Sequence, residues 1–201
     1  GGSYYFRNIE FINENIGFLG TLNGEFFKTV DGGDQWTEVN NISSNPGAIC
    51  GLDTAGDSTI YGCGAYFEPA YIIKSEDKGE TWTYIDMSVY ADALVEILFL
   101  DEQTGFVCGT NTDGATILKT TDGGLSWAEI YNSNVPGEFV WKLQNLQGNS
   151  DIIFGSIQPV APSLGKLIKS TDGGLNWSSY NAPVTGIQTL GFITPNYGWI
   201  G

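Results

Sequence analysis

Histidine is absent from this chain of 201 residues, and Arg7 is its only arginine. The first absence excludes an imidazole general base and histidine ligands for a metal. The second excludes a clamp of several arginines around a carboxylate or a phosphate. Cysteine is scarce too, because Cys50, Cys63 and Cys108 are too few for a disulfide framework and form no Cys-x-x-Cys zinc motif. We expect all three to be small buried strand residues, with a Cys50–Cys63 bridge across a hairpin as the open alternative.

Long apolar runs and positive charge are also lacking. No run of about 18 apolar residues occurs, so the sequence predicts no membrane-spanning helix. Only 8 lysines and arginines stand against 23 acidic residues, which gives a net charge of −15. A surface this negative repels a phosphate backbone, and we therefore expect no nucleic-acid partner.

Glycine and aromatic residues are abundant instead. The chain has 28 glycines, and 13% of its residues are aromatic. This mixture is typical of many short strands joined by tight turns. The length suits one large all-β domain with a core of its own.

An eight-residue motif occurs four times, at residues 29–36, 75–82, 120–127 and 170–177. It begins with Ser or Thr, carries Asp at its third position and Gly at its fifth, and ends in Trp. The four aspartates are separated by 46, 45 and 50 residues, a period that indicates a repeat architecture. The recurring residues are Asp31, Gly33, Trp36, Asp77, Gly79, Trp82, Asp122, Gly124, Trp127, Asp172, Gly174 and Trp177.

A series of glycines has the same period as the motif. Gly20, Gly64, Gly109, Gly155 and Gly201 are separated by 44, 45, 46 and 46 residues, and each ends a short apolar strand. Each repeat thus predicts strand A, a polar turn, strand B, a variable loop, strand C, the motif as a turn, and strand D. Four antiparallel strands per roughly 45 residues are typical of a β-propeller blade.

The predicted fold is therefore an all-β propeller of four-stranded antiparallel blades, without long helices. We expect a single domain, or a fragment of one, over residues 1–201. Blades are expected at about 8–40, 48–86, 94–131 and 139–181, with a partial blade at 187–201. The last strand pair leaves Trp199 and Ile200 at an apolar edge, which we expect further blades of a longer chain or a second copy to cover.

The motif is expected to stabilise the turn between strands C and D. Its Asp accepts backbone N–H groups, its Gly supplies a positive φ, and its Ser or Thr bonds to the turn backbone. Its Trp folds an apolar face under the hairpin. Calcium would need about six to eight oxygen ligands, whereas each motif has one Asp without a cluster of acidic partners. We therefore expect the motif residues to be structural, and assign no metal and no cofactor.

The four motifs resemble the Asp-box, or BNR, repeat. The arrangement Gly-Phe-Leu-Gly, followed by Lys-Thr-x-Asp-Gly-Gly-x-x-Trp, is most similar to photosystem II assembly/stability factor-like propellers of the bacterial secreted type. The resemblance covers the whole chain, and sialidases, xyloglucanases and sortilin-type receptors carry the same box. It implies a propeller of more than four blades, often about seven, in a secreted or cell-surface protein, with a periplasmic location as a further option.

A binding site is expected on the face that carries the B–C and D–A loops, because varied loops on a regular scaffold commonly hold binding residues. The richest loop contains Tyr66, Phe67 and Glu68, with Tyr71 close by. Its aromatic faces and carboxylate suit a sugar or a peptide, and the alternative is a loop packed against its neighbour. Further candidates, with ordinary solvated loop residues as the alternative, are Asn111, Asp113, Tyr90, Asp92 and Glu138.

The sequence favours a non-enzymatic binding or scaffold module that recognises a glycan or a protein surface, with no catalytic residue assigned. The alternative is a glycoside hydrolase. A xyloglucanase-like inverting enzyme needs two carboxylates about 6.5–9.5 Å apart, and nothing in the sequence singles out a pair. A sialidase-like enzyme is disfavoured because Arg7 alone cannot hold its carboxylate substrate. An assembly factor for a membrane complex, the third hypothesis, is expected to present a basic patch that this acidic chain lacks.

Overall fold

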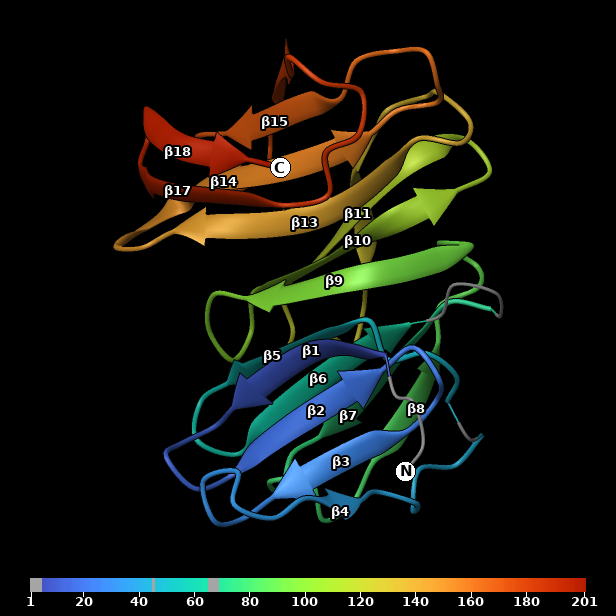
Figure 1. The fold of residues 1–201 in the computed structure, drawn as a ribbon, viewed down its shortest axis with the longest axis vertical. Coiled ribbons are helices and arrows are strands. Elements are labelled where there is room, and N and C mark those ends of the chain that lie inside the picture. Colours follow the sequence, from blue (N-terminus) through green and yellow to red (C-terminus); the bar gives the residue numbers. More distant parts are fainter. Residues whose placement is uncertain (1–4, 45, 65–68) are drawn as a thin grey trace.

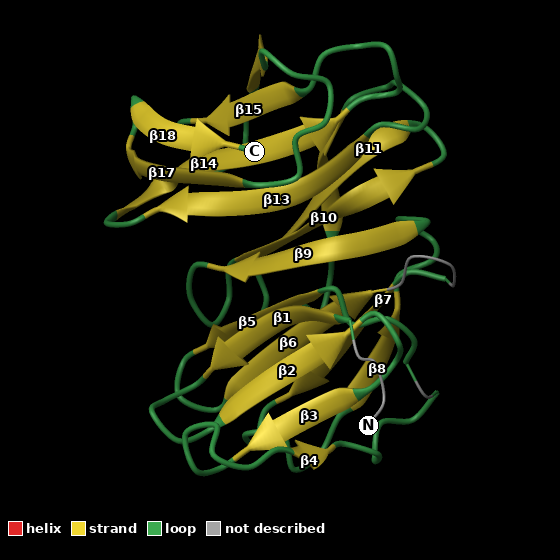
Figure 2. Ribbon diagram, in the orientation of Figure 1, coloured by secondary structure: helices red, strands yellow, loops and turns green. Residues whose placement is uncertain are grey.

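The computed structural model describes residues 5–44, 46–64 and 69–201 of the chain. Every regular element in these ranges is a β-strand, as Figure 2 shows. Within them, therefore, no helix could span a membrane. The strands form five antiparallel sheets, and the expectation of an all-β fold without long helices is confirmed for this part of the chain.

Four of the sheets are complete blades, each with strands A to D in chain order. The first two blades contain β1 (Phe6–Phe11), β2 (Gly17–Thr21), β3 (Phe26–Thr29), β4 (Thr37–Glu38), β5 (Gly51–Ala55), β6 (Thr59–Gly64), β7 (Tyr71–Ser75) and β8 (Thr83–Asp86). The next two contain β9 (Ala93–Phe99), β10 (Gly105–Asn111), β11 (Gly114–Thr120), β12 (Ala128–Asn132), β13 (Phe139–Leu146), β14 (Asn149–Gln158), β15 (Lys166–Ser170) and β16 (Ser178–Asn181). The fifth sheet pairs β17 (Leu190–Thr194) with β18 (Tyr197–Ile200). The predicted propeller, four blades and the start of a fifth, is confirmed.

In the third and fourth blades the outer strand is the least buried, whereas in the first blade β1 also has no buried residue. In the third blade every residue of β9 except Leu98 is buried, and β10 is buried from Gly105 to Gly109. The outer strand β12 has no buried residue, and β16 is exposed along its whole length. Aliphatic and aromatic residues therefore fill the inner strands, where neighbouring blades cover both faces.

The hydrophobic core lies between the blades rather than inside them. It consists of four clusters, one for each pair of adjacent blades, which contain Phe18 with Ile60, Tyr61 with Val107, Phe106 with Ile153, and Phe154 with Leu190. A blade depends on its neighbour for burial, as expected for a propeller. Figure 1 shows β9 between β5 and β13, and these innermost strands are in contact.

The three cysteines are part of this packing. Cys50, Cys63 and Cys108 are all buried free thiols, as expected. Cys63 and Cys108 lie on β6 and β10, whereas Cys50 directly precedes β5 and is not a strand residue. Burial raises the pKa of Cys50 to about 11 and the pKa of the other two well above the ordinary thiol value. Such thiols carry little thiolate at neutral pH and are poor nucleophiles.

Candidate functional site

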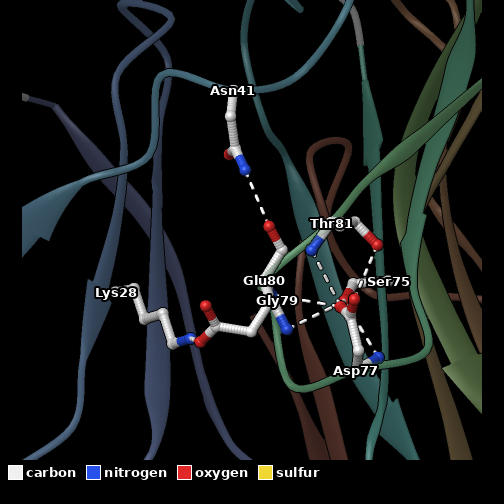
Figure 3. Close-up of polar contacts among 7 residues, drawn as sticks. All are labelled: Lys28, Asn41, Ser75, Asp77, Gly79, Glu80 and Thr81. Carbon is white, nitrogen blue, oxygen red and sulfur yellow. Dashed lines mark hydrogen bonds and ion pairs between the residues drawn. The ribbon is translucent and has the colours of Figure 1, made fainter.

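The second Asp-box shows how the box hairpins are held (Figure 3). The carboxylate of Asp77 accepts backbone N–H groups of Thr81 and Glu80 at 2.8 and 3.1 Å, and the hydroxyl of Thr81 at 2.6 Å. Ser75 Oγ donates to the same carboxylate at 2.8 Å and accepts the N–H of Gly79 at 2.8 Å. Both oxygens of the Asp77 carboxylate are thus engaged by donors that close the turn, which is a structural role.

The other boxes repeat this pattern around Asp31, Asp122 and Asp172. These bonds lower the pKa of Asp77, Asp122 and Asp172 to about 2. The largest cause in each case is the side-chain donor four residues later, followed by the backbone N–H of that residue. For Asp31 the backbone N–H of Gln35 is the largest cause of a lowered pKa. The box carboxylates therefore stay ionised far into the acid range.

Each later box also packs on the blade before it. Gly79 has a φ of +79°, and a Cβ at this position would lie 2.5 Å from the ring of Phe18 in the first blade. Trp82 meets Phe18 and Phe26 edge-on, with ring centroids 5.8 and 5.2 Å away. Glycine is required here both for the left-handed backbone and for the close approach of the neighbouring blade.

The box tryptophans are less enclosed than the sequence predicts. Trp127 is buried, with 7% of its surface exposed, whereas Trp36, Trp82 and Trp177 are half-buried. Trp36 and Trp177 precede outer strands that are exposed along their whole length, β4 and β16, whereas β12 after Trp127 is half-buried at three residues. They remain packed, since Trp177 lies edge-on to Tyr131 of the preceding blade at 5.8 Å.

A lysine on strand C of every complete blade lies over an aromatic ring on strand B. The two residues are direct cross-strand neighbours, and the ammonium nitrogen is 5.3–6.0 Å from the ring centroid. These lysine–ring pairs are Lys28 with Phe18, Lys74 with Tyr61, Lys119 with Phe106, and Lys169 with Phe154. Sequence reasoning missed them, although a lysine stands three residues before every box Asp.

Lysine–ring pairs also bind the next blade. Lys119 Nζ donates to the carbonyl oxygen of Gly173 in the fourth box at 2.8 Å. In the second blade the ring residue, and not the lysine, bonds to the next blade. The hydroxyl of Tyr61 donates to the carbonyl oxygen of Gly123 at 2.9 Å. One pair thus connects two strands of its own blade to the Asp-box of the following one.

A groove of about 560 Å³ separates the first blade from the second Asp-box. Lys28 ion-pairs with the carboxylate of Glu80 at 2.6 Å, and Asn41 Nδ2 donates to the carbonyl oxygen of Glu80 at 2.8 Å (Figure 3). Gln35 and Glu38 complete the polar wall. The groove is open because β4 has two residues, whereas the outer strands of the other complete blades have four or five.

The A–B turns and the Asp-box turns lie on one face of the propeller, which we call the box-turn face. Hydrogen bonds of 2.9 to 3.0 Å join the two turns within a blade, from Gly32 to Asn15, Lys78 to Ser58, Gly123 to Gln103, and Gly173 to Asp151. Exposed carboxylates gather on this face: Glu14, Asp31, Asp34, Asp57, Glu76, Asp77, Glu80, Asp101, Glu102 and Asp151. The box-turn face is therefore strongly acidic.

Most positively charged side chains bond to other groups of the fold. Six lysines bond to a carboxylate or a backbone carbonyl oxygen: Lys28, Lys74, Lys119, Lys142, Lys166 and Lys169. Lys78 and Arg7 are exposed. The exposed charge of the molecule is accordingly dominated by carboxylates.

Of the four candidates in and beside the aromatic loop, the structure describes only Tyr71. Tyr66, Phe67 and Glu68 lie outside the described residues. Tyr71 is 1% exposed, and its hydroxyl donates to the carbonyl oxygen of Ala48 at 2.8 Å. Its ring belongs to the core between the first two blades, so Tyr71 is not available to a ligand in this arrangement.

The remaining loop candidates have different surroundings. Asn111 Oδ1 accepts the backbone N–H groups of Asp113 and Gly114, which closes the β10–β11 turn. Glu138 is 2% exposed and ion-paired with Lys166, so it is a buried structural residue and not a surface residue. The exposed candidates on this face are Asp113, Tyr90 and Asp92.

Buried charges connect the innermost strands. Glu96 on β9 is 8% exposed and ion-paired with Lys142 on β13. Asp53 on β5 accepts the backbone N–H of Phe99 at 2.5 Å, and burial raises the pKa of Asp53 to about 7. Both carboxylates thus bond to a residue of the following blade, and their role is structural.

These features define an Asp-box β-propeller. The chain belongs to the family described as Photosynthesis system II assembly factor YCF48, whose sequence model matches residues 77–183. The resemblance predicted from the box motifs is thereby confirmed. No curated protein sequence matches the chain.

Solved structures of low sequence identity share the fold. YCF48 bound to D1 peptide has a TM-score of 0.54 and 16% identity over 98% of this chain and 88% of that one. YCF48 from Cyanidioschyzon merolae has a TM-score of 0.54 and 13% identity, with 98% and 92% of the two chains covered. The GH74 xyloglucanase from Xanthomonas campestris has a TM-score of 0.63 and 16% identity, and 83% of this chain covers 28% of the enzyme.

Proposed function

We propose that this propeller is a non-enzymatic module that binds a cationic segment of a partner protein on its box-turn face. The observation that carries the proposal is the use of six lysines within the fold, which leaves carboxylates as the dominant exposed charge. An acidic surface speeds the encounter with basic segments and disfavours acidic ones.

The family supports a peptide as the kind of ligand. A propeller of this family is known in a structure bound to D1 peptide. The surface of the present chain differs from the basic patch expected of an assembly factor, because its net charge is −15. The proposed partner therefore carries lysine or arginine, and a glycan bound through the B–C and D–A loops is the competing ligand.

Matched variants on two faces test this function. Asp57→Asn with Glu102→Gln neutralises two exposed carboxylates of the box-turn face, and Asp92→Asn with Asp113→Asn neutralises two on the loop face. The probe is a labelled Lys-Gly repeat peptide, with a Glu-Gly peptide as its control. We expect binding of the lysine peptide that weakens with added salt, and a several-fold loss in the box-turn variant alone. A loss confined to the loop-face variant, or binding to a glycan array without binding to the peptide, would contradict the proposal.

A glycoside hydrolase is the second candidate function. The observation that favours it is Asp53, whose pKa is raised to about 7 by burial, with the carboxylates of Glu10 and Glu96 also raising it. A raised pKa is a property of a general acid in such enzymes. Release of reducing sugar from xyloglucan by the chain, and its loss in Asp53→Asn, is the test that separates this candidate from the binding module.

A further inference from the structure

The first Asp-box differs from the other three at one carboxylate oxygen. In the second, third and fourth boxes, the side chain four residues after the Asp donates to its Oδ2, and these donors are Thr81, Ser126 and Asn176. The first box has Gln35 at this position, and its backbone N–H bonds to Asp31 Oδ1. Among the described residues no side chain donates to Asp31 Oδ2, since the hydroxyl in this box also bonds to Oδ1. This oxygen is therefore open to a donor from outside the box.

Asp31 is part of the wall of the groove that separates the first blade from the second Asp-box. Both sides of the groove belong to the described chain, the first blade with Asp31 and Glu38 and the second with Glu80. Lys28 supplies the ammonium group of the groove and is already ion-paired with Glu80 at 2.6 Å (Figure 3). Glu38 on β4 is exposed and has no ion pair within the part of the chain that the structure describes. Three carboxylates against one ammonium group leave the groove with an excess of two negative charges.

An arginine side chain suits this set of groups. Its guanidinium is planar and carries five N–H donors, whereas the ammonium of lysine is a compact point charge. The groove offers several separate acceptors, which are Asp31 Oδ2, the Glu38 carboxylate and the amide oxygen of Gln35. Val30 and Val39 add apolar surface for the aliphatic stem of the side chain. The described residues that line the groove include no aromatic ring on which a sugar could stack.

We propose that this groove binds an arginine side chain of a partner protein, with the guanidinium bonded to Asp31 Oδ2 and to the carboxylate of Glu38. The inference rests on the proposed function, since it names the place beside the Asp-boxes where a cationic segment docks and the residue type that docks there. Hydrogen bonds between a guanidinium and a carboxylate are stronger than those between neutral groups. The shortness of β4, with two residues, leaves the groove open to such a side chain.

A substitution that closes the open oxygen without changing the charge tests the proposal. Gln35→Thr introduces the residue of the second box, whose hydroxyl bonds to the box carboxylate at 2.6 Å. The probes are labelled Arg-Gly and Lys-Gly repeat peptides, compared by fluorescence anisotropy. We expect the Arg peptide to bind roughly fivefold more tightly than the Lys peptide, and Gln35→Thr and Glu38→Gln each to remove most of this preference. Asn176→Thr in the fourth box exchanges one side-chain donor for another, so this matched control keeps the preference.

Three results would overturn the inference. They are the absence of binding of the Arg peptide, equal binding of the Arg and Lys peptides, and a preference for arginine that survives in both Gln35→Thr and Glu38→Gln. Because Gln35→Thr leaves the net charge unchanged, binding of the Lys peptide to the box-turn face should be the same in this variant. A Lys peptide that binds as the proposed function predicts, without a preference for arginine, would therefore overturn the groove site and leave the proposed function standing.

Discussion

Lys119 lies over the ring of Phe106, with its ammonium nitrogen 5.3 Å from the ring centroid, and the two are direct cross-strand neighbours. The same ammonium group donates to the carbonyl oxygen of Gly173 at 2.8 Å. A single side chain therefore connects two strands of the third blade to the Asp-box of the fourth. In repeat proteins the interface between units contributes a separate part of the stability, and contacts of this kind supply it.

Replacement of this lysine should weaken the interface between the third and fourth blades. Lys119→Met keeps much of the apolar stem but removes the cation and the donor. We expect the free energy of unfolding to fall by about 1–2 kcal/mol, from one cation–π contact and one hydrogen bond. Urea denaturation measures the change. Lys78→Met, at an exposed box position, is the control and should change stability by less than about 0.5 kcal/mol.

The box tryptophans should differ in their contribution to stability. Trp127 is buried, and Trp127→Ala should lower the free energy of unfolding by roughly 3–5 kcal/mol, the usual range for a buried aromatic side chain. Trp36 is half-buried, with Phe11 as an edge-on neighbour at 6.1 Å, so Trp36→Ala should cost less. Equal losses in the two variants would show that partial exposure does not reduce the packing energy at the first box.

Local sequence patterns were sufficient to predict the blades. The expectation that a glycine ends strand B is, however, wrong for β10 and β14, which continue past Gly109 and Gly155 to Asn111 and Gln158. The Asp-box bonds join residues only two to four positions apart, such as Ser75 and Asp77. Turn chemistry of this range can be deduced from sequence because donors and acceptors are fixed by the chain itself. For the same reason the box hairpins could be placed at residue level.

Contacts between blades could not be predicted from the sequence. Tyr61 donates to Gly123, 62 positions away, and Glu96 pairs with Lys142, 46 positions away. Such partners depend on how two blades stack, which the residue pattern within one blade does not define. Tyr71 is the clearest case, since an aromatic residue beside a variable loop suits a ligand site and a core position equally well until its neighbours are known.

Removal of divalent metal should leave the fold unchanged. The described residues contain no group of three or more acidic or cysteine side chains arranged for a metal ion. Box carboxylates such as that of Asp77 are already engaged by N–H and O–H donors. We expect the same Tm in EDTA and in calcium, by circular dichroism. A decrease of several degrees in EDTA would reveal a calcium site that contributes to stability.

The Asp-boxes should make the fold sensitive to acid. The pKa of Asp122 is lowered to about 2, chiefly by the hydroxyl of Ser126, against about 3.9 in an unfolded chain. A lowered pKa contributes stability above the unfolded value, and this contribution is lost as the pH falls from about 4 toward 2. Asp122→Asn should give a shallower decline in this window, and Ser126→Ala should reduce the decline in part. Unfolding free energies at several pH values between 5 and 2 test the prediction, and an unchanged slope in both variants would contradict it.

Asp53 should give the stability of the fold the opposite dependence on pH, over a higher pH range. Burial is the largest cause that raises its pKa to about 7, and Glu10 and Glu96 add to the effect. Between about pH 4 and 7 the folded state keeps a proton that the unfolded chain has lost, given an unfolded pKa of about 3.9. Stability from this group is therefore complete below pH 4, falls as the pH rises to 7, and is constant above.

The variant Asp53→Asn isolates this contribution, because it removes the titration while keeping an acceptor for the N–H of Phe99. The decline in unfolding free energy between about pH 4 and 7 should become shallower in the variant, with the remainder due to Glu10 and Glu96, whose pKa values are also raised by burial. Carbon-13 NMR of the Asp53 carboxyl gives its titration directly. A midpoint near 4, together with equal slopes in the two proteins, would show that Asp53 is solvated and that the innermost strands are less tightly packed than the structure indicates. A midpoint near 7 with a reduced slope would establish that burial of Asp53 makes the stability of the fold depend on the protonation of this carboxyl.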